Sequence, residues 1–155
     1  MRLLVLTLTL AAVLAGCATG PVDRPPAEQP TLTTEQRRLK DALRGTPVVV
    51  DTSADGRMRI EVPLQFSFDA GRGAVKPPLA AVLDRLAAGL RSGNFDVRVA
   101  APADPKGSNP VLVQDRAASV RDYLVARGVR LARIVGLSKA NGEFVEVLVS
   151  ERAAR

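Results

Sequence analysis

Apolar residues recur at helical spacing in two long stretches of the chain. In the first stretch they fall at i, i+3, i+4, i+7 and i+11, which predicts one apolar stripe on a helix: Leu79, Val82, Leu83, Leu86 and Leu90. In the second stretch the predicted stripe is Val113, Ala117, Val120 and Leu124. Gly93 and Gly128 follow the two stripes and are typical of helix ends. Each helix therefore has one face to bury.

Shorter segments predict strands. Residues 57–62 alternate with period two, which puts three apolar side chains on one face: Met58, Ile60 and Val62. Asp55-Gly56 is a hairpin signal that joins this strand to residues 48–50. Further strands are expected at 65–68, 95–99, 133–137 and 144–149. The prediction is an α+β fold of order β-α-β-α-β-β, with two helices on a mixed sheet, preceded by a short helix and a β-hairpin.

The short leading helix has its own start and stop signals. Thr33 and Gln36 form a capping-box pattern, and Gly45 ends the helix. The residues before it show no apolar period and are crowded with turn formers: Gly20, Pro21, Pro25, Pro26 and Pro30. They are therefore expected to be a linker that holds the folded part away from whatever anchors the chain.

The first residues predict export and a lipid anchor. Arg2 precedes an apolar run from Leu3 to Leu14, which has the length of a signal peptide and is too short to span a bilayer. The segment from Leu14 to Cys17 resembles the bacterial lipobox, which implies cleavage before Cys17 and acylation of it, with palmitate among the chains. Ala18 is not Asp, which by the same resemblance implies the periplasmic face of the outer membrane. An ordinary secretory signal followed by an incidental cysteine is the alternative.

These signals predict four segments. Residues 1–16 are a signal peptide, and residues 17–32 are the lipidated Cys17 with its Pro-rich linker. Residues 33–63 are a lead-in helix and β-hairpin, and residues 64–150 are the main α+β domain.

Composition narrows the classes of function. The chain has no His, and Cys17 is its only Cys, so histidine bases, histidine metal sites and thiol catalysis are excluded, and we expect no enzyme, metal or cofactor. Aromatic residues make up 3% of the chain, which with export argues against a nucleic-acid partner. The net charge of +6 leaves open an anionic polymer, an anionic lipid, or merely a solvated basic surface.

One pair of charged residues suggests a binding site. Asp104 lies in a Pro-rich loop after the strand at 95–99, and Arg116 lies at the edge of the apolar stripe on the next helix. Facing each other across a cleft, the two would suit a zwitterion, with its ammonium on Asp104 and its carboxylate on Arg116. A structural salt bridge is the alternative from spacing alone.

Residues from about Phe66 to Val149 resemble the OmpA-like C-terminal domain family. The most specific part is the segment from Leu112 to Leu124, where charged and small residues match along with the stripe. The resemblance implies non-covalent binding of peptidoglycan through the diaminopimelate of its stem peptide. It also implies that Asp104 and Arg116 grip this ligand and that Asn109 assists them.

The sequence departs from the family pattern in the binding loop. Ala101-Pro102-Ala103 replaces three of its four motif residues, and only Asp104 is kept. Both arginines that usually open the last strand are missing before Phe144. Two hypotheses follow: a peptidoglycan-binding lipoprotein of the outer membrane, or a structural or partner-binding envelope lipoprotein that keeps the fold without binding peptidoglycan.

Overall fold

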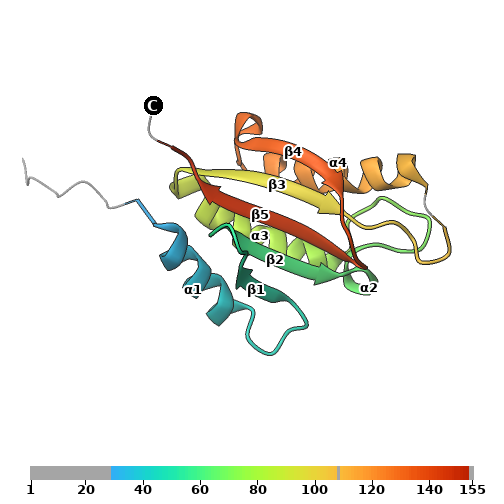
Figure 1. Cartoon of the computed structure of the whole chain (residues 1–155), viewed down its shortest axis with the longest axis horizontal. Coiled ribbons are helices and arrows are strands. Elements are labelled where there is room, and N and C mark those ends of the chain that lie inside the picture. The colour runs from blue at the N-terminus through green and yellow to red at the C-terminus, as the bar shows by residue number, and fades with distance from the viewer. Residues whose placement is uncertain (1–28, 108, 154–155) are drawn as a thin grey trace, which may run out of the picture.

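Five strands form one mixed sheet in the computed structural model, which describes residues 29–107 and 109–153. The order across the sheet is β1-β2-β5-β3-β4 (Figure 1). The β3–β4 pair is parallel and the other pairs are antiparallel. The bounds are β1 Val49–Thr52, β2 Met58–Pro63, β3 Phe95–Ala101, β4 Ile134–Lys139 and β5 Phe144–Glu151.

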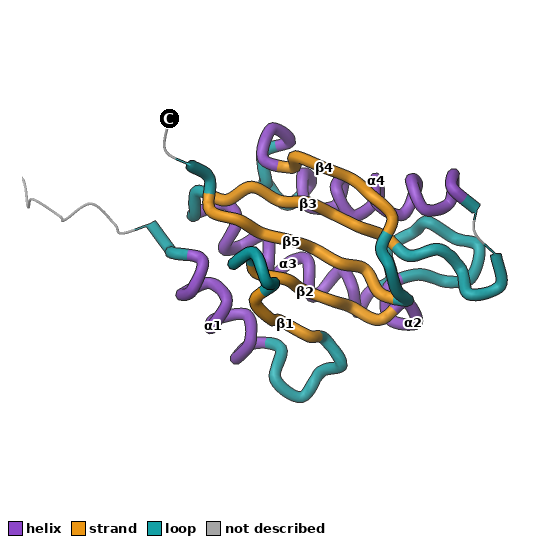
Figure 2. Tube along the Cα trace, viewed as in Figure 1, coloured by secondary structure: helices purple, strands orange, loops and turns teal. Residues whose placement is uncertain are grey.

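Two long helices, α3 (Pro77–Ser92) and α4 (Pro110–Ala126), lie side by side on one face of this sheet (Figure 2). Three short ones complete the described chain: α1 (Leu32–Ala42), α2 (Leu64–Ser67) and the 3-10 turn η1 (Leu131–Arg133). Both predicted stripes are buried against the sheet, and β2 alternates between buried and half-buried residues. The predicted fold class is confirmed.

Both long helices end at the glycines that were predicted to end them. Gly93 is the C-cap of α3, and its N–H donates to the carbonyl of Gly89 over 3.0 Å. Gly128 follows the C-cap of α4 with φ of +89°, a left-handed conformation that favours glycine. The hairpin is confirmed as well, since β1 and β2 pair around the turn that contains Gly56.

Two local predictions are wrong. Residues 65–68 were expected to be a strand, but Leu64–Ser67 is the single helical turn α2, and β2 serves as the strand before α3. The hydroxyl of Ser67 donates to the carbonyl of Pro63 over 3.0 Å, which closes this turn. Alternation of apolar residues over so short a run does not separate a strand from one helical turn that leads into the core.

The second error concerns the start of α1. The predicted cap Thr33 lies inside the helix, and Thr31 is the N-cap, with its hydroxyl accepting from the N–H of Thr34 at 3.3 Å. Gln36 donates instead to the hydroxyl of Thr52 on β1 over 2.9 Å. Thr31 and Thr33 both belong to the residue types that cap helices, so residue type alone does not decide between them.

A buried carboxylate fastens α1 to α3. Glu35 is 2% exposed, and its partner Arg38 donates through Nε to Oε2 over 2.9 Å. Arg38 also donates to the carbonyl of Arg85 on α3 over 2.6 Å. Gly89 of α3 leaves the room for the Glu35 carboxylate, because a Cβ at position 89 would lie 1.9 Å from Glu35 Oε1.

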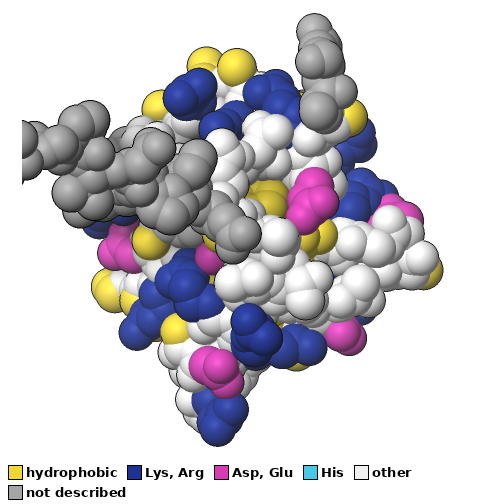
Figure 3. Space-filling view, turned by 90° about the vertical axis from the view of Figure 1, so that its left-hand side faces the viewer, with side chains coloured by type: hydrophobic (Ala, Val, Ile, Leu, Met, Phe, Trp, Pro, Cys, Tyr) yellow, Lys and Arg dark blue, Asp and Glu magenta, His cyan; other side chains and the backbone are white. Residues whose placement is uncertain are grey.

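Arginines gather at the end of the molecule where α3 and α4 finish, and Figure 3 views this end. Arg91 donates to the carbonyl of Arg127 over 2.7 Å, and Arg133 donates to the carbonyls of Leu90 and Gly93. Guanidinium groups at helix C-termini satisfy carbonyls that have no partner within the helix.

Within residues 29–107 and 109–153, no helix is long and apolar enough to cross a membrane.

Candidate functional site

A tight turn shapes the loop between β3 and α4. The N–H of Gly107 donates to the carbonyl of Asp104 over 3.2 Å, with Pro105 and Lys106 between them. Proline at the second position and glycine at the fourth are typical of such turns. Asp104, Lys106, Gly107 and Asn109 line an open hollow of about 330 Å³.

The structure brings Asp104 and Arg116 into direct contact. Arg116 Nη2 lies 2.5 Å from Asp104 Oδ1, so the two side chains touch and no cleft separates them. The Asp104 side chain is 21% exposed, whereas that of Arg116 is 0% exposed. The two residues therefore form the salt bridge that spacing alone offered as the alternative, and only its carboxylate member reaches the surface.

Arg116 also ties two loops together beneath the hollow. Its Nε donates to the carbonyl of Arg72 over 3.0 Å, Nη1 to that of Pro102 over 2.9 Å, and Nη2 to that of Asp69 over 3.2 Å. Its guanidinium carbon lies 5.1 Å from the centre of the Phe68 ring, a cation–π contact. Four of the five N–H donors of the guanidinium are thus engaged within the protein.

The Asp104 carboxylate is fixed from two sides. Its second oxygen, Oδ2, accepts from the N–H of Gly71 over 2.7 Å. The hydrogen bond from Arg116, followed by that from Gly71, lowers the pKa of this carboxyl below its ordinary value. Asp104 is therefore an anion at neutral pH, held in one orientation with part of its surface toward the hollow.

This lowered pKa predicts a pH-dependent stability. A group whose pKa is lowered by folding stabilises the protein above its unfolded value, near 4, and this contribution is lost as pH falls through the folded value. We expect the free energy of unfolding, measured by urea denaturation, to fall more steeply from about pH 5 to about pH 2 in the wild type than in Asp104→Asn. Parallel curves for the two proteins would contradict this assignment.

Asn109 is the N-cap of α4. Its Oδ1 accepts from the N–H groups of Val111 at 3.0 Å and Leu112 at 3.4 Å. Pro110 occupies the first helical turn, where its missing N–H costs nothing. Asn109 therefore has a structural role at the rim of the hollow, next to Asp104 in the lining.

Sequence reasoning did not single out Lys106 or the loop at 69–72. The Asp-Pro-Lys-Gly turn signature at 104–107 was the available signal for Lys106, because a tight turn brings its fourth residue back to its first and so keeps Lys106 in the same short loop segment as Asp104. The loop at 69–72 contributes main-chain groups, which leave no mark in side-chain patterns.

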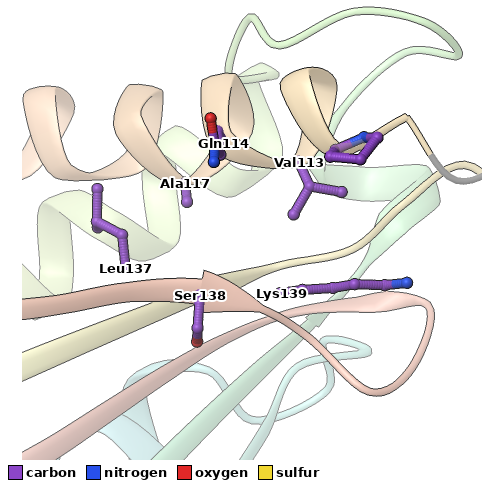
Figure 4. Close-up of a pocket in the computed structure, with 7 residues that line it drawn as sticks. Val113, Gln114, Ala117, Leu137, Ser138 and Lys139 are labelled. Atoms are coloured by element: carbon purple, nitrogen blue, oxygen red, sulfur yellow. The ribbon is translucent and has the colours of Figure 1, made fainter.

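A second cavity of about 400 Å³ lies between α4 and the edge strand β4 (Figure 4). Val113, Ala117 and Leu137 point into it from the two elements, while Ser138 points to the other side of the strand. Leu137 is 40% exposed and its neighbour Val135 is 48% exposed. This cavity is lined mainly by apolar groups and lies apart from the Asp104 carboxylate.

Two further predictions concern a metal site and the lipid attachment site. Among residues 29–107 and 109–153, no cluster of three or more His, Cys, Asp or Glu is arranged to hold a metal ion. Cys17, the predicted lipid attachment site, lies outside the described residues.

No protein-family model and no curated protein matches the sequence. Solved structures do match it. A MotB-like protein from Desulfovibrio vulgaris is 17% identical with a TM-score of 0.64, over 78% of this chain and 92% of that one. The cell wall anchor of the T6SS from Pseudomonas aeruginosa is 22% identical with a TM-score of 0.63, over 81% and 100%.

An OmpA-like domain is among these structures. That of FopA1 from Francisella tularensis is 14% identical with a TM-score of 0.52, over 70% of this chain and 83% of that one. At such low identity the likeness establishes the fold alone. The family resemblance seen around Leu112–Leu124 and the arrangement of helices on the sheet agree with it. The chain therefore has the OmpA-like fold.

Proposed function

We propose that this protein is a lipoprotein, anchored through Cys17 on the periplasmic face of the outer membrane, that binds peptidoglycan without a covalent bond. The ligand is the diaminopimelate of the stem peptide. The observation that carries the proposal is the Asp104 carboxylate, ionised and oriented by Arg116 and Gly71 at the rim of an open hollow. The likeness to a cell wall anchor supports the same class of ligand.

The residues around the hollow suit the zwitterionic end of diaminopimelate. Asp104 would accept the ligand's ammonium group in a charge-assisted hydrogen bond, the stronger kind of hydrogen bond in proteins. Arg116 holds Asp104 in place from below, and Asn109 fixes the start of α4 beside it. The proposal needs no catalytic group, metal or cofactor, because the task is to hold the ligand.

The test is co-sedimentation of the full chain, solubilised in detergent, with purified sacculi of the diaminopimelate type. We expect the wild type to pellet and Asp104→Ala to stay in the supernatant, because the ammonium loses its charged acceptor. Asp41→Ala removes an exposed carboxylate on α1 and serves as the matched control that still pellets. Circular dichroism verifies that each protein is folded. A folded wild type that stays in the supernatant would refute the proposal.

A second function is favoured by the cavity between α4 and β4. Its apolar lining and the exposed Val135 and Leu137 on the edge strand β4 suit an envelope protein partner. A photo-crosslinking residue at position 137, in the cells that produce the protein, tests this idea. One specific protein adduct together with no sedimentation on sacculi would favour the partner-binding function over the peptidoglycan-binding one.

A further inference from the structure

Arg116 is poorly placed to receive the carboxylate of a ligand. Its side chain is 0% exposed, and four of its five donors are engaged by Asp104 and by the carbonyls of Asp69, Arg72 and Pro102. A ligand carboxylate would reach it only after the loops at 69–72 and 102–104 had opened and those bonds had broken. A cation that already faces the hollow has no such requirement.

Lys106 is the cation that lines the hollow. It is exposed, and no described residue forms an ion pair with it. Lys106 lies two positions after Asp104, inside the turn that Gly107 closes on the carbonyl of Asp104. Both residues line the same hollow of about 330 Å³. The hollow is thus bordered by Asp104, which can accept from an ammonium group, and by Lys106, which can donate to a carboxylate.

We propose that Lys106, and not Arg116, binds the carboxylate of the zwitterionic ligand whose ammonium group is bound by Asp104. Arg116 is then a positioning residue that fixes Asp104 and the two loops. This inference rests on the proposed function, and it names the residue that recognises the ligand's negative charge. The lysine ammonium group acts as a mobile point charge with three donors, so it needs no fixed fork geometry.

The inference is tested by sedimentation of the full chain with two kinds of sacculi, one with the free diaminopimelate carboxylate and one with this carboxylate amidated. On the free-carboxylate sacculi we expect Lys106→Ala to weaken binding roughly tenfold or more, as for loss of one charge-assisted hydrogen bond. Lys106→Arg retains the positive charge and should retain most of the binding. Lys40→Ala, which removes an exposed lysine on α1, should bind as the wild type does.

The amidated sacculi separate a specific contact from general attraction to an anionic polymer. Amidation removes the charge that Lys106 recognises, so the wild type should weaken to the level of Lys106→Ala, and that variant should not weaken further. If the wild type binds and Lys106→Ala binds equally well, the inference is wrong and the proposed function stands. If the folded wild type binds neither kind of sacculi, both are wrong.

Discussion

Arg116→Ala is expected to lower the free energy of unfolding by about 3–5 kcal/mol, the cost of breaking a buried ion pair from one side. The substitution removes the guanidinium donors from three carbonyls and from the Asp104 carboxylate, which keeps only the N–H of Gly71. It also removes the cation from the face of Phe68. At this chain length the loss corresponds to a fall in Tm of about 6–20 °C. Thermal and urea denaturation followed by circular dichroism measure it.

Two further variants locate the origin of that loss. Asp104→Asn keeps the shape and removes only the charge, so it should cost less than Arg116→Ala, because the three carbonyls keep their donor. Arg116→Lys keeps the charge but cannot reach carbonyls on both loops at once, so it should fall between the other two. If Arg116→Ala is as stable as the wild type, the guanidinium is not the clamp that the distances indicate.

This expectation affects how binding data are interpreted. Loss of sedimentation in Arg116→Ala would follow from collapse of the loops at 69–72 and 102–104, whether or not the guanidinium meets the ligand. Asp104 and Lys106 lie at the surface of the hollow, so their variants report on contact more directly. The salt bridge considered from spacing and the ligand-binding role are therefore compatible: the same pair fixes the loops and orients the carboxylate.

The long helices and the sheet could be predicted because they repeat one pattern over many residues. The stripe from Leu79 to Leu90 allows one helix face to be buried, and Gly93 marks the end of that helix. The alternation at 57–62 similarly fixes which side of β2 faces the core. The proximity of Asp104 and Arg116 could be predicted as well, because both residues lie next to the same loop. The prediction separated them by a cleft, whereas in the structure they are in direct contact.

The burial of Arg116 could not be predicted, because it depends on carbonyl groups from distant segments. Asp69 and Arg72 are more than forty positions away, and they contribute through their main chain, which every residue type possesses. An arginine at the edge of an apolar stripe is usually expected to extend to solvent. Whether the guanidinium is buried depends on how many acceptors surround it, and the tertiary structure sets that number.

The docking of α1 also depends on a detail of tertiary structure. Glu35 occupies a helix face with Leu39 and Leu43, yet its carboxylate is as deeply buried as they are. A sequence pattern would assign a glutamate to the solvent side. The room for it comes from Gly89 on α3, which lies in the final turn of a helix where glycine is otherwise unfavourable.

Gly89→Ala is therefore expected to destabilise the protein when residue 35 is Glu and to stabilise it when residue 35 is Ala. In the wild type the new methyl group would lie 1.9 Å from Glu35 Oε1, so the carboxylate must leave its site and weaken the contact between α1 and α3. We expect a loss of about 1–3 kcal/mol, as for overpacking of a core. In Glu35→Ala the space is empty, and the same change should stabilise α3 by about 0.5–1 kcal/mol, the usual gain of alanine over glycine in a helix.

Urea denaturation of the wild type, the two single variants and the double variant measures this coupling. Hydrogen exchange gives a second, local readout: in Gly89→Ala the amides of α1 should exchange faster, while those of β3 and β5 stay protected. If Gly89→Ala destabilises both backgrounds equally, the carboxylate does not fill the space above Gly89. A reversed sign would show that a single missing side chain on α3 allows the lead-in helix to dock with a charged residue in its buried face.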